Sequence, residues 1–369
     1  MRPDSTSASR SESDGQTWLP HSCLSLVLLK WLALAIVAAL SATQAAAAQA
    51  AEPVRELVAF EKAHIWFGRE NRREITTTVE FPELGTFANL RLELVLDCPQ
   101  GGCDAWDRFG SLAIIPEGQP EQRIELARFI TPYGVGGAWS VDLTDLRQLL
   151  TGRVKLAAFI DTWVGPQSTR HGTGWLLSAS FHLQPGQPPR QVVDVIPVFA
   201  RTSVTYGDPS RPIGAQLPAR KLQLRGEGLK WVVRSFVTGH GQGNLDNCAE
   251  FCAKTHHLQL QGHTFSERIW RDDCDQNPLS SQKGNWKYPR AGWCPGAPVR
   301  PWWVDVSKAV QDSTASELTV AYAVETYENS CRPDAPVCGG CALGTGCAYD
   351  DGRHTEPKWI VSSLLIGYR

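Results

Sequence analysis

The chain has 369 residues, 42% of them hydrophobic and 20% charged, a composition typical of globular rather than disordered proteins. Its formal net charge of −2 lacks the basic surplus of nucleic-acid-binding proteins, so we expect no nucleic-acid partner. The length allows two domains and an additional segment.

The N-terminus has the pattern of a targeting signal. Lys30 precedes an apolar run over 31–40, and small residues follow it up to Ala48-Gln49-Ala50. This order is typical of a secretory signal with an A-x-A cleavage site, and the run is too short to span a membrane comfortably. We therefore expect residues 1–50 to be removed, leaving a secreted or periplasmic protein without a membrane segment.

The rest of the chain reads mostly as β-structure. Leucines at 90, 92, 94 and 96 occupy every second position, which is the period of a half-buried strand. Further short apolar runs, such as "VKLAAFIDTW" and "LTVAYAVETY", are separated by Gly, Pro and Asn clusters. This spacing predicts an all-β fold of antiparallel sandwiches.

An unusual loop follows the first of these strands. "LDCPQGGCDAWDRFG", from Leu96 to Gly110, closes two cysteines around a Gly-Gly turn and then sets Asp104, Trp106, Asp107 and Arg108 close together. Two carboxylates, an indole and a guanidinium in so few positions indicate either a solvated turn or one wall of a sugar-sized polar pocket.

Two features divide the mature chain into halves. "LQPGQPPRQ", over 183–191, is the most linker-like stretch, and we place a linker at 186–191 between domains 51–185 and 192–369. The segments 139–163 and 302–327 also share an order of aromatic-x-Val-Asp, a short helical turn, a strand and acid-Thr-aromatic. This similarity predicts two copies of one sandwich topology, side by side.

The ten cysteines after the leader, an even number in an oxidising compartment, predict five disulfides. Their spacing suggests the pairs Cys98–Cys103, Cys248–Cys252 and Cys274–Cys294, leaving Cys331, Cys338, Cys341 and Cys347 to pair among themselves. The C-x-x-C within this last group could instead hold zinc.

Three acids near aromatic residues or tight cysteine loops are candidates for catalysis: Asp107, Asp161 and Glu250. Hydrolysis of a glycosidic or amide bond needs one carboxylate to activate water or attack, and a second to tune it or donate a proton. Glu250 lies between Cys248 and Cys252, so a disulfide there would fix the backbone that carries the carboxylate.

The histidines offer a metal site as an alternative. His256 and His257 are adjacent, and on a strand they would point to opposite faces, which is poor for binding one ion. There is no HExxH motif, and the mature chain lacks the Met that a copper monooxygenase on paired sandwiches would usually recruit. We therefore expect no metal and no cofactor.

Four motifs in order, "CPQGGCDAWDRFG", "RFITPYGVGG", "CAEFCAKTHH" and "GNWKYPRAGWCPG", resemble the bacterial peptide-N-glycosidase F family. The resemblance runs from about residue 57 to the C-terminus and includes the three short-range cysteine pairs. It implies two eight-stranded jelly-roll sandwiches and an exported, metal-free amidase that cleaves the β-aspartyl-glucosamine linkage of N-linked glycans. Its partners would be N-glycosylated proteins or glycopeptides, and we expect a monomer.

The resemblance also implies roles for individual residues. Asp107, rather than Asp104, matches the principal catalytic Asp, and Glu250 matches a second acid between close cysteines. Asp161, in Asp-Thr-Trp, stands where the family has a Glu as its third acid. The positions implied around the sugar-binding cleft are Trp106, Arg108, Trp163, Arg290 and His240.

Three departures bear on the choice of glycan. Asp161 is one methylene shorter than the family's Glu, and Gly134 and His240 stand where the family has cleft tryptophans. The cysteine-rich segment 331–347 has no match and is either a stabilised surface loop or an edge of the cleft. Two alternatives remain open: a glycan-binding module that has lost hydrolysis, and a copper-dependent oxidase on the same scaffold.

Overall fold

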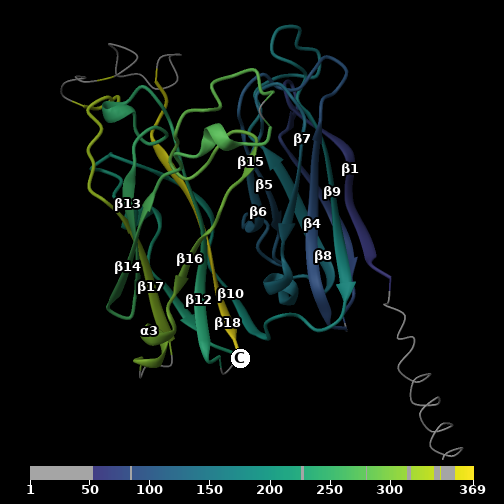
Figure 1. Cartoon of the computed structure of the whole chain (residues 1–369). Helices are drawn as coiled ribbons and strands as arrows, with labels where there is room; N and C mark the ends of the chain where they lie inside the picture. Colours follow the sequence, from purple (N-terminus) through teal and green to yellow (C-terminus); the bar gives the residue numbers. More distant parts are fainter. Residues whose placement is uncertain are drawn as a thin grey trace, which may run out of the picture. The chain divides into compact units, whose positions relative to one another are not determined.

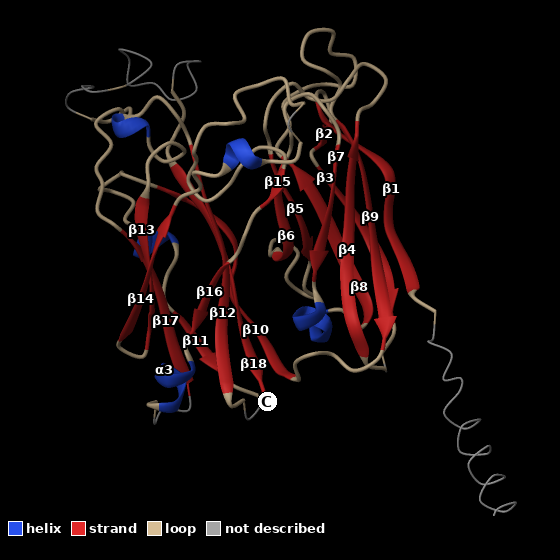
Figure 2. Cartoon of the chain, in the orientation of Figure 1, coloured by secondary structure: helices blue, strands red, loops and turns tan. Residues whose placement is uncertain are grey.

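The computed structural model describes residues 53–83, 85–225, 228–279, 281–313, 317–335, 341 and 354–369. Within them the chain forms four antiparallel sheets, arranged as two sandwiches (Figures 1 and 2). This confirms the predicted all-β class of paired antiparallel sandwiches. No helix in the described ranges is long and apolar enough to cross a membrane. The leader expected at 1–50 lies outside them.

The first sandwich has eight strands longer than two residues. One sheet has the order β2 (Asn71–Arg72), β1 (Arg55–Phe67), β9 (Trp175–Pro185), β4 (Phe87–Asp97), β7 (Gly137–Asp142). The other has the order β15 (Ala297–Pro298), β6 (Ile124–Ile130), β5 (Phe109–Ile114), β8 (Gly152–Ile160), β3 (Glu74–Phe81). The short strand β15 comes from the second half of the sequence and pairs with β6.

The second sandwich also has eight strands. Its first sheet has the order β10 (Val192–Thr205), β18 (Lys358–Tyr368), β12 (Lys230–His240), β16 (Trp302–Asp305). Its second has the order β11 (Arg220–Gln223), β17 (Glu317–Val324), β13 (Lys254–Leu260), β14 (His263–Ile269). The described helical turns are η1 (Thr144–Leu149), α2 (Ile213–Gln216), η2 (Leu245–Asn247), η3 (Cys274–Gln276) and α3 (Ser307–Gln311).

Both sandwiches share one strand order. Numbered within each half, the first, eighth, third and sixth long strands form one sheet, and the other four form the second. The similar segments found in the sequence occupy equivalent places, since β7, η1 and β8 correspond to β16, α3 and β17. The internal similarity therefore reflects two copies of one topology, as predicted.

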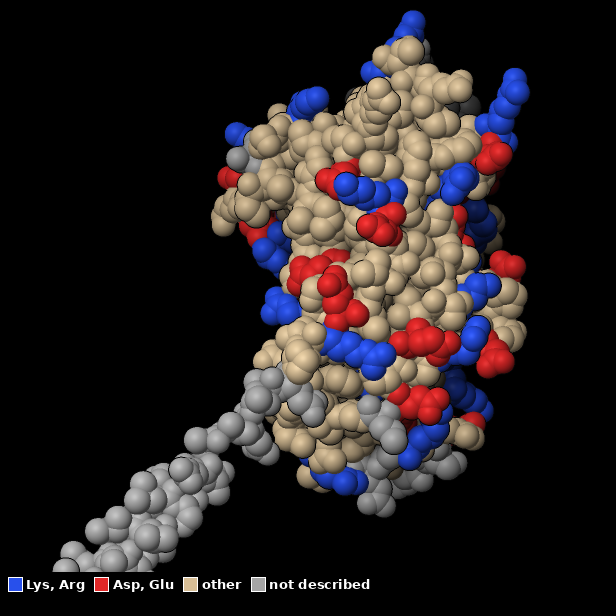
Figure 3. Space-filling view, turned by 90° about the vertical axis from the view of Figure 1, so that its right-hand side faces the viewer, with Lys and Arg blue, Asp and Glu red and all other residues tan. Residues whose placement is uncertain are grey.

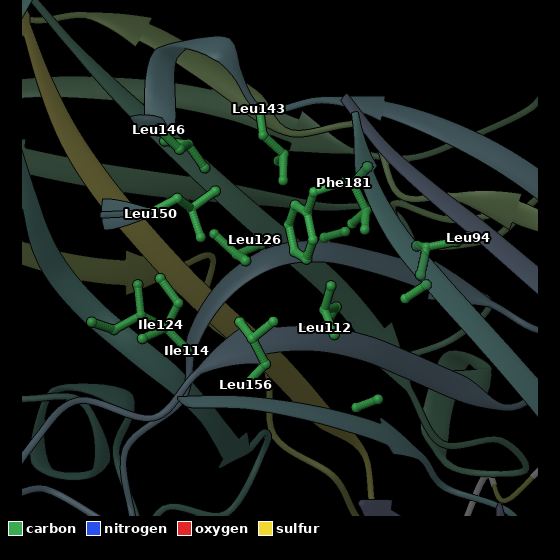
Figure 4. Packing of buried hydrophobic residues seen from close by; sticks show 14 of the residues in the cluster. Leu94, Leu112, Ile114, Ile124, Leu126, Leu143, Leu146, Leu150, Leu156 and Phe181 are labelled. Atoms are coloured by element: carbon green, nitrogen blue, oxygen red, sulfur yellow. The ribbon is translucent and has the colours of Figure 1, made fainter. Parts of the chain in front are cut away.

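The core of the first sandwich follows from the period of two in its strands. The leucines at 90, 92, 94 and 96 on β4 are all buried, whereas Arg91 between them is exposed. They pack with Phe181 of β9 and with Leu112 and Leu156 of the facing sheet, and η1 covers one end of this core (Figure 4). Burial of large side chains is the main stabilising contribution here.

The surface that Figure 3 shows carries charges of both signs, with Lys and Arg interspersed among Asp and Glu. Arg91 and Glu93, both exposed on the first sandwich, are 3.8 Å apart. Exposed pairs of this kind contribute little to stability, about 0–1 kcal/mol. No large area of one sign appears on this face.

On the central strands of the second sandwich, successive side chains point alternately into its own core and toward the first sandwich. Trp359 and Val361 of β18 point into their own core, whereas Ile360 packs with Phe109 of β5 and Phe236 of β12. Side chains at even positions at this end of β12 and β18 therefore face the first sandwich.

A buried ion pair lies in this interface. Arg128 is 1% exposed, and its Nη2 is 2.5 Å from Glu125 Oε2. The same guanidinium donates to the carbonyl oxygen of Ile360 (2.7 Å) and to Thr238 Oγ1 (3.0 Å), both in the second sandwich. The guanidinium of Arg128 thus connects the first sandwich, where Arg128 pairs with Glu125, to the second sandwich.

The structure contains the three disulfides that the spacing suggested, Cys98–Cys103, Cys248–Cys252 and Cys274–Cys294. A fourth joins Cys331 to Cys341, so these two sulfurs are not free thiolates for zinc. Cys338 and Cys347 lie outside the described residues.

Candidate functional site

Asp104 fixes the loop between β4 and β5. Its side chain is fully buried and accepts hydrogen bonds from Arg108 Nε (2.8 Å), Thr162 Oγ1 (2.6 Å) and the backbone nitrogen of Trp106 (3.1 Å). A disulfide closes the same loop. Because the residues on both sides of it are held, Asp107 presents its carboxylate in a fixed direction.

Asp107 and Glu250 come from different sandwiches and meet at the guanidinium of Arg290. Arg290 Nη2 lies 3.7 Å from Asp107 Oδ2, and Arg290 Nε lies 3.3 Å from Glu250 Oε1. The Arg290 side chain is 2% exposed, against 13% for Asp107 and 17% for Glu250. Asp107 Oδ2 is buried and faces Arg290, and a side-chain hydrogen bond with Tyr133 also acts on the Asp107 carboxylate.

Backbone oxygens hold the guanidinium of Arg290 in place. Nη1 donates to the carbonyl of Tyr288 (2.8 Å), and Nη2 donates to that of Asn285 (2.9 Å). Nη2 also lies 3.3 Å from the Tyr133 hydroxyl, and Cζ is 4.9 Å from the centre of the Phe251 ring. Rotation of the guanidinium would break these contacts, so the two carboxylates share a preorganised cation.

Three connections fix the backbone of Glu250. Its nitrogen donates to Gly241, just after β12 (3.0 Å), and its carbonyl accepts from Ala291 (2.9 Å). The Cys248–Cys252 disulfide encloses it. The backbone that carries the Glu250 carboxylate is therefore held by two hydrogen bonds and one disulfide.

Burial and mutual repulsion perturb both acids. Burial, followed by the charge of Asp107, raises the pKa of Glu250 to about 8, with Arg290 acting in the opposite direction. Burial also raises the pKa of Asp107 above its usual value, and Arg290 is the main opposing influence. Two carboxylates beside one cation retain a proton at neutral pH, and we assign that proton to Glu250.

Asp107 opens onto a cleft of about 620 Å³, a volume common for ligand sites. The cleft is lined by Asp107, Arg108, Phe109, Asp161 and Trp163 of the first sandwich and by His240, Gly241, Thr355, Glu356, Lys358 and Ile360 of the second. Five of the eight predicted catalytic and binding residues thus share its wall. Arg290 lies beside Asp107, and Glu250 lies beside Arg290, but neither residue lines the cleft. Another cavity of equal volume, near Arg201, contains none of the predicted residues.

His240 is an uncharged aromatic element of this wall. Its ring stacks on Trp293 at 5.5 Å and meets the edge of Phe109 at 5.9 Å. Nε2 is 2.9 Å from Thr238 Oγ1. Burial, and to a smaller extent the charge of Lys358, lowers the pKa of His240 well below its usual value. The ring is therefore neutral at physiological pH.

Asp161 is paired with an arginine that the sequence did not single out. Arg73 Nη1 is 3.0 Å from Asp161 Oδ1, and Arg73 Cζ lies 4.3 Å from the centre of the Trp163 ring and 4.7 Å from that of Phe67. One cation therefore orients both the shortened acid and the exposed indole of the Asp-Thr-Trp segment.

Neither Trp106 nor Gly134 belongs to the described lining of the cleft. Trp106 is 49% exposed, with its indole 6.2 Å from the ring of His171, and it does not line the cleft; its role beneath a sugar stays a prediction. Gly134 has a φ of +62°, and a Cβ there would lie 3.3 Å from the Lys283 side chain. A tryptophan at this position would be strained.

The histidine pair does not form a metal site. His256 is buried with Nδ1 2.5 Å from the Tyr322 hydroxyl, whereas His257 Nδ1 lies 2.8 Å from Ser266 Oγ. Among the described residues, no group of three or more His, Cys, Asp or Glu side chains is arranged to hold a metal ion.

The array can hydrolyse a polar bond in the cleft. An ionised acid and a neighbouring protonated acid together supply a base and a proton donor, and fixed arginines stabilise negative charge. Sequence reasoning missed Tyr133, Asp104, Arg73 and Lys358. Tyr133 and Asp104 lie within quoted motifs, but no pattern in the sequence indicated their contacts.

Comparisons with known proteins match both halves of the chain. The model for the C-terminal part of peptide-N-glycosidase F matches residues 221–366, and the model for its N-terminal part matches residues 113–170, together more than half of the chain. The chain is 29% identical over 289 residues to peptide-N(4)-(N-acetyl-beta-D-glucosaminyl)asparagine amidase F from Elizabethkingia miricola, covering 73% of this chain and 77% of that protein.

Solved structures agree with these matches. PNGase F, a glycosylasparaginase from Flavobacterium meningosepticum, superposes with a TM-score of 0.69 and 25% identity, covering 86% of this chain and 96% of that chain. PNGF-II superposes with a TM-score of 0.64 at 19% identity, covering 85% of this chain and 65% of that chain, and supports the fold alone.

Proposed function

The chain belongs to the peptide-N-glycosidase F family, and on this premise we propose that it hydrolyses the β-aspartyl-glucosamine amide bond of N-linked glycans. Glycoproteins or glycopeptides are its substrates, and the asparagine becomes aspartate. The observation that carries the proposal is the buried Asp107–Arg290–Glu250 array, which opens through Asp107 onto a cleft large enough for a sugar.

The roles follow from protonation and position. Ionised Asp107 accepts a proton from a water molecule, and the water oxygen attacks the carbonyl carbon of the amide. Protonated Glu250 does not line the cleft, so it delivers its proton to the departing nitrogen through one water molecule as the carbon–nitrogen bond breaks, and the glycan leaves as a glycosylamine. Arg108, fixed by Asp104, places positive charge at the cleft wall, and Arg290 opposes the rise in the pKa of Asp107 that burial causes.

Location, assembly and domain limits are also proposals. Four described disulfides suit an oxidising compartment, so we place the mature protein outside the cytoplasm, in the medium or the periplasm, as a monomer. We place domains at 51–185 and 192–369 with a linker at 186–191, because β9 ends at Pro185 and β10 begins at Val192.

The test is the identity of the products from a defined N-glycopeptide. An amidase leaves aspartate at the former glycosylation site and releases the glycan with its innermost glucosamine. Cleavage within the glycan would leave glucosamine on asparagine, and binding without turnover would leave the glycopeptide intact; either result would reject the proposal. Mass spectrometry of the peptide distinguishes all three.

Glu250→Gln should remove the alkaline limb of the pH–rate profile. With its pKa raised to about 8, Glu250 is protonated below that pH and loses its proton above it, so kcat/KM of the wild type should fall as pH rises through this region. Gln cannot donate that proton, and we expect a loss of about 10²-fold in kcat with no limb near pH 8. Glu250→Asp is the control and should keep a limb. An unchanged limb in Glu250→Gln would contradict the assignment.

Arg73→Met should weaken substrate binding more than chemistry. Asp161 and Trp163 would lose their common cation, and we expect KM to rise by about threefold to tenfold, with kcat changed less. Steady-state kinetics on the glycopeptide give both constants. Arg153→Met, which removes an exposed arginine 3.4 Å from Glu80, is the matched control and should leave both unchanged. Equal effects of the two substitutions would show that Arg73 has no part in the cleft.

A further inference from the structure

The charged residues of the cleft wall differ in whether the protein neutralises them. Four of the five have an oppositely charged partner within 4 Å, and the fifth is Lys358. The paired ones are Asp107 with Arg290, Arg108 with Asp104, Asp161 with Arg73, and Glu356 with Arg211. Lys358 forms no ion pair and no side-chain hydrogen bond with the residues that the structure describes.

Lys358 has a defined direction because it lies on a central strand. It begins β18 and pairs across the sheet with His240 of β12. Trp359 next to it is buried in the core of the second sandwich, and Ile360 packs toward the first. Period-two alternation places Lys358 on the same side as Ile360, where both line the cleft.

The charge of Lys358 acts on the site and is only partly screened. The side chain is half-buried, and its positive charge contributes to the lowered pKa of His240. His240 is neutral, so it neither repels nor replaces an anion there. Glu356, the other charged residue nearby in sequence, is held by Arg211 at 2.5 Å. A half-buried cation without a counter-charge is best satisfied by a ligand anion.

We propose that Lys358 forms an anion subsite in the cleft, and that the enzyme prefers substrates with a carboxylate, sulfate or phosphate close to the scissile amide. This inference rests on the proposed amidase function of the same cleft. The anion has two possible sources: an acidic substituent on the innermost sugars, or an acidic side chain of the peptide next to the glycosylated asparagine. Both present the same chemistry to the ammonium group.

The test compares kcat/KM for three glycopeptides: a neutral one, one with an added aspartate beside the glycosylated asparagine, and one with a sulfate on the innermost sugars. We expect the wild type to favour at least one anionic substrate by roughly tenfold at low salt, and less at high salt. Lys358→Gln should abolish this ratio, and Lys358→Arg should keep most of it. The anionic glycopeptide that the wild type prefers, with the added aspartate or with the sulfate, identifies the source of the anion.

Lys230→Gln is the matched control, because it removes an exposed lysine that pairs with Asp305 at 3.7 Å. It should leave the ratio unchanged. Equal rates for all three substrates with the wild type, or a preference that survives Lys358→Gln, would overturn the inference. Failure to cleave any of the three substrates would instead count against the amidase function, so the two failures are distinguishable.

Discussion

Asp107→Asn should lower kcat on an N-glycopeptide by on the order of 10³-fold or more while the protein stays folded. The variant keeps the shape of the side chain but loses the base that removes a proton from water. The loop should not collapse, because its anchor is the buried Asp104 and not Asp107. Loss of one negative charge beside Glu250 also relieves repulsion in the array.

Single-turnover kinetics combined with calorimetric measurement of glycopeptide binding separate chemistry from affinity in this variant. We expect binding within a few-fold of wild type and an unchanged thermal midpoint. Asp97→Asn, at the exposed end of β4, is the control and should keep full activity. A rate for Asp107→Asn within about tenfold of wild type would remove Asp107 from the catalytic role.

Arg128→Met should produce a large loss of stability, about 3–5 kcal/mol in the free energy of unfolding. The substitution removes the paired cation of Glu125, which is 2% exposed and also interacts with the charges of Arg201 and Arg234. It also removes the hydrogen bonds to Ile360 and Thr238 of the second sandwich. Urea denaturation followed by fluorescence measures the change.

The double variant Arg128→Met/Glu125→Gln is the decisive control. Replacing both partners removes the unpaired carboxylate but also the anion beside Arg201 and Arg234, so it should recover part of the stability that the single variant loses. A double variant as unstable as the single one would show that packing, rather than the buried charge, accounts for the effect. An exposed pair, Arg153 with Glu80, should give less than about 1 kcal/mol in the same measurement.

Local patterns were sufficient for much of the fold. The leucines of β4 alternate, and the structure buries each of them. The similarity between the two halves indicated one topology used twice, and cysteine spacing gave three disulfides. These inferences succeeded because a period of two and a short covalent loop are properties of neighbouring residues.

The contacts that complete the site are long-range, and the sequence contains no sign of them. Arg73 reaches Asp161 across 88 residues. Lys358 meets His240 only because β18 lies beside β12. The pairing of β15, from the second half of the sequence, with β6 of the first sandwich is likewise a long-range contact. Motifs identified Asp107, Glu250 and Arg290 separately, whereas their common contact depends on how the two sandwiches pack.

The central claim is that the Asp107–Arg290–Glu250 array directs water to the amide carbon of a glycosylated asparagine. The most direct measurement is hydrolysis of a defined N-glycopeptide in water enriched in heavy oxygen, with wild type and Asp107→Asn in parallel. We predict that the wild type places one heavy oxygen in the new aspartate side chain and releases an intact glycan, while the variant does neither at a comparable rate. An unlabelled asparagine that keeps a sugar, or equal labelling by both proteins, would contradict the claim.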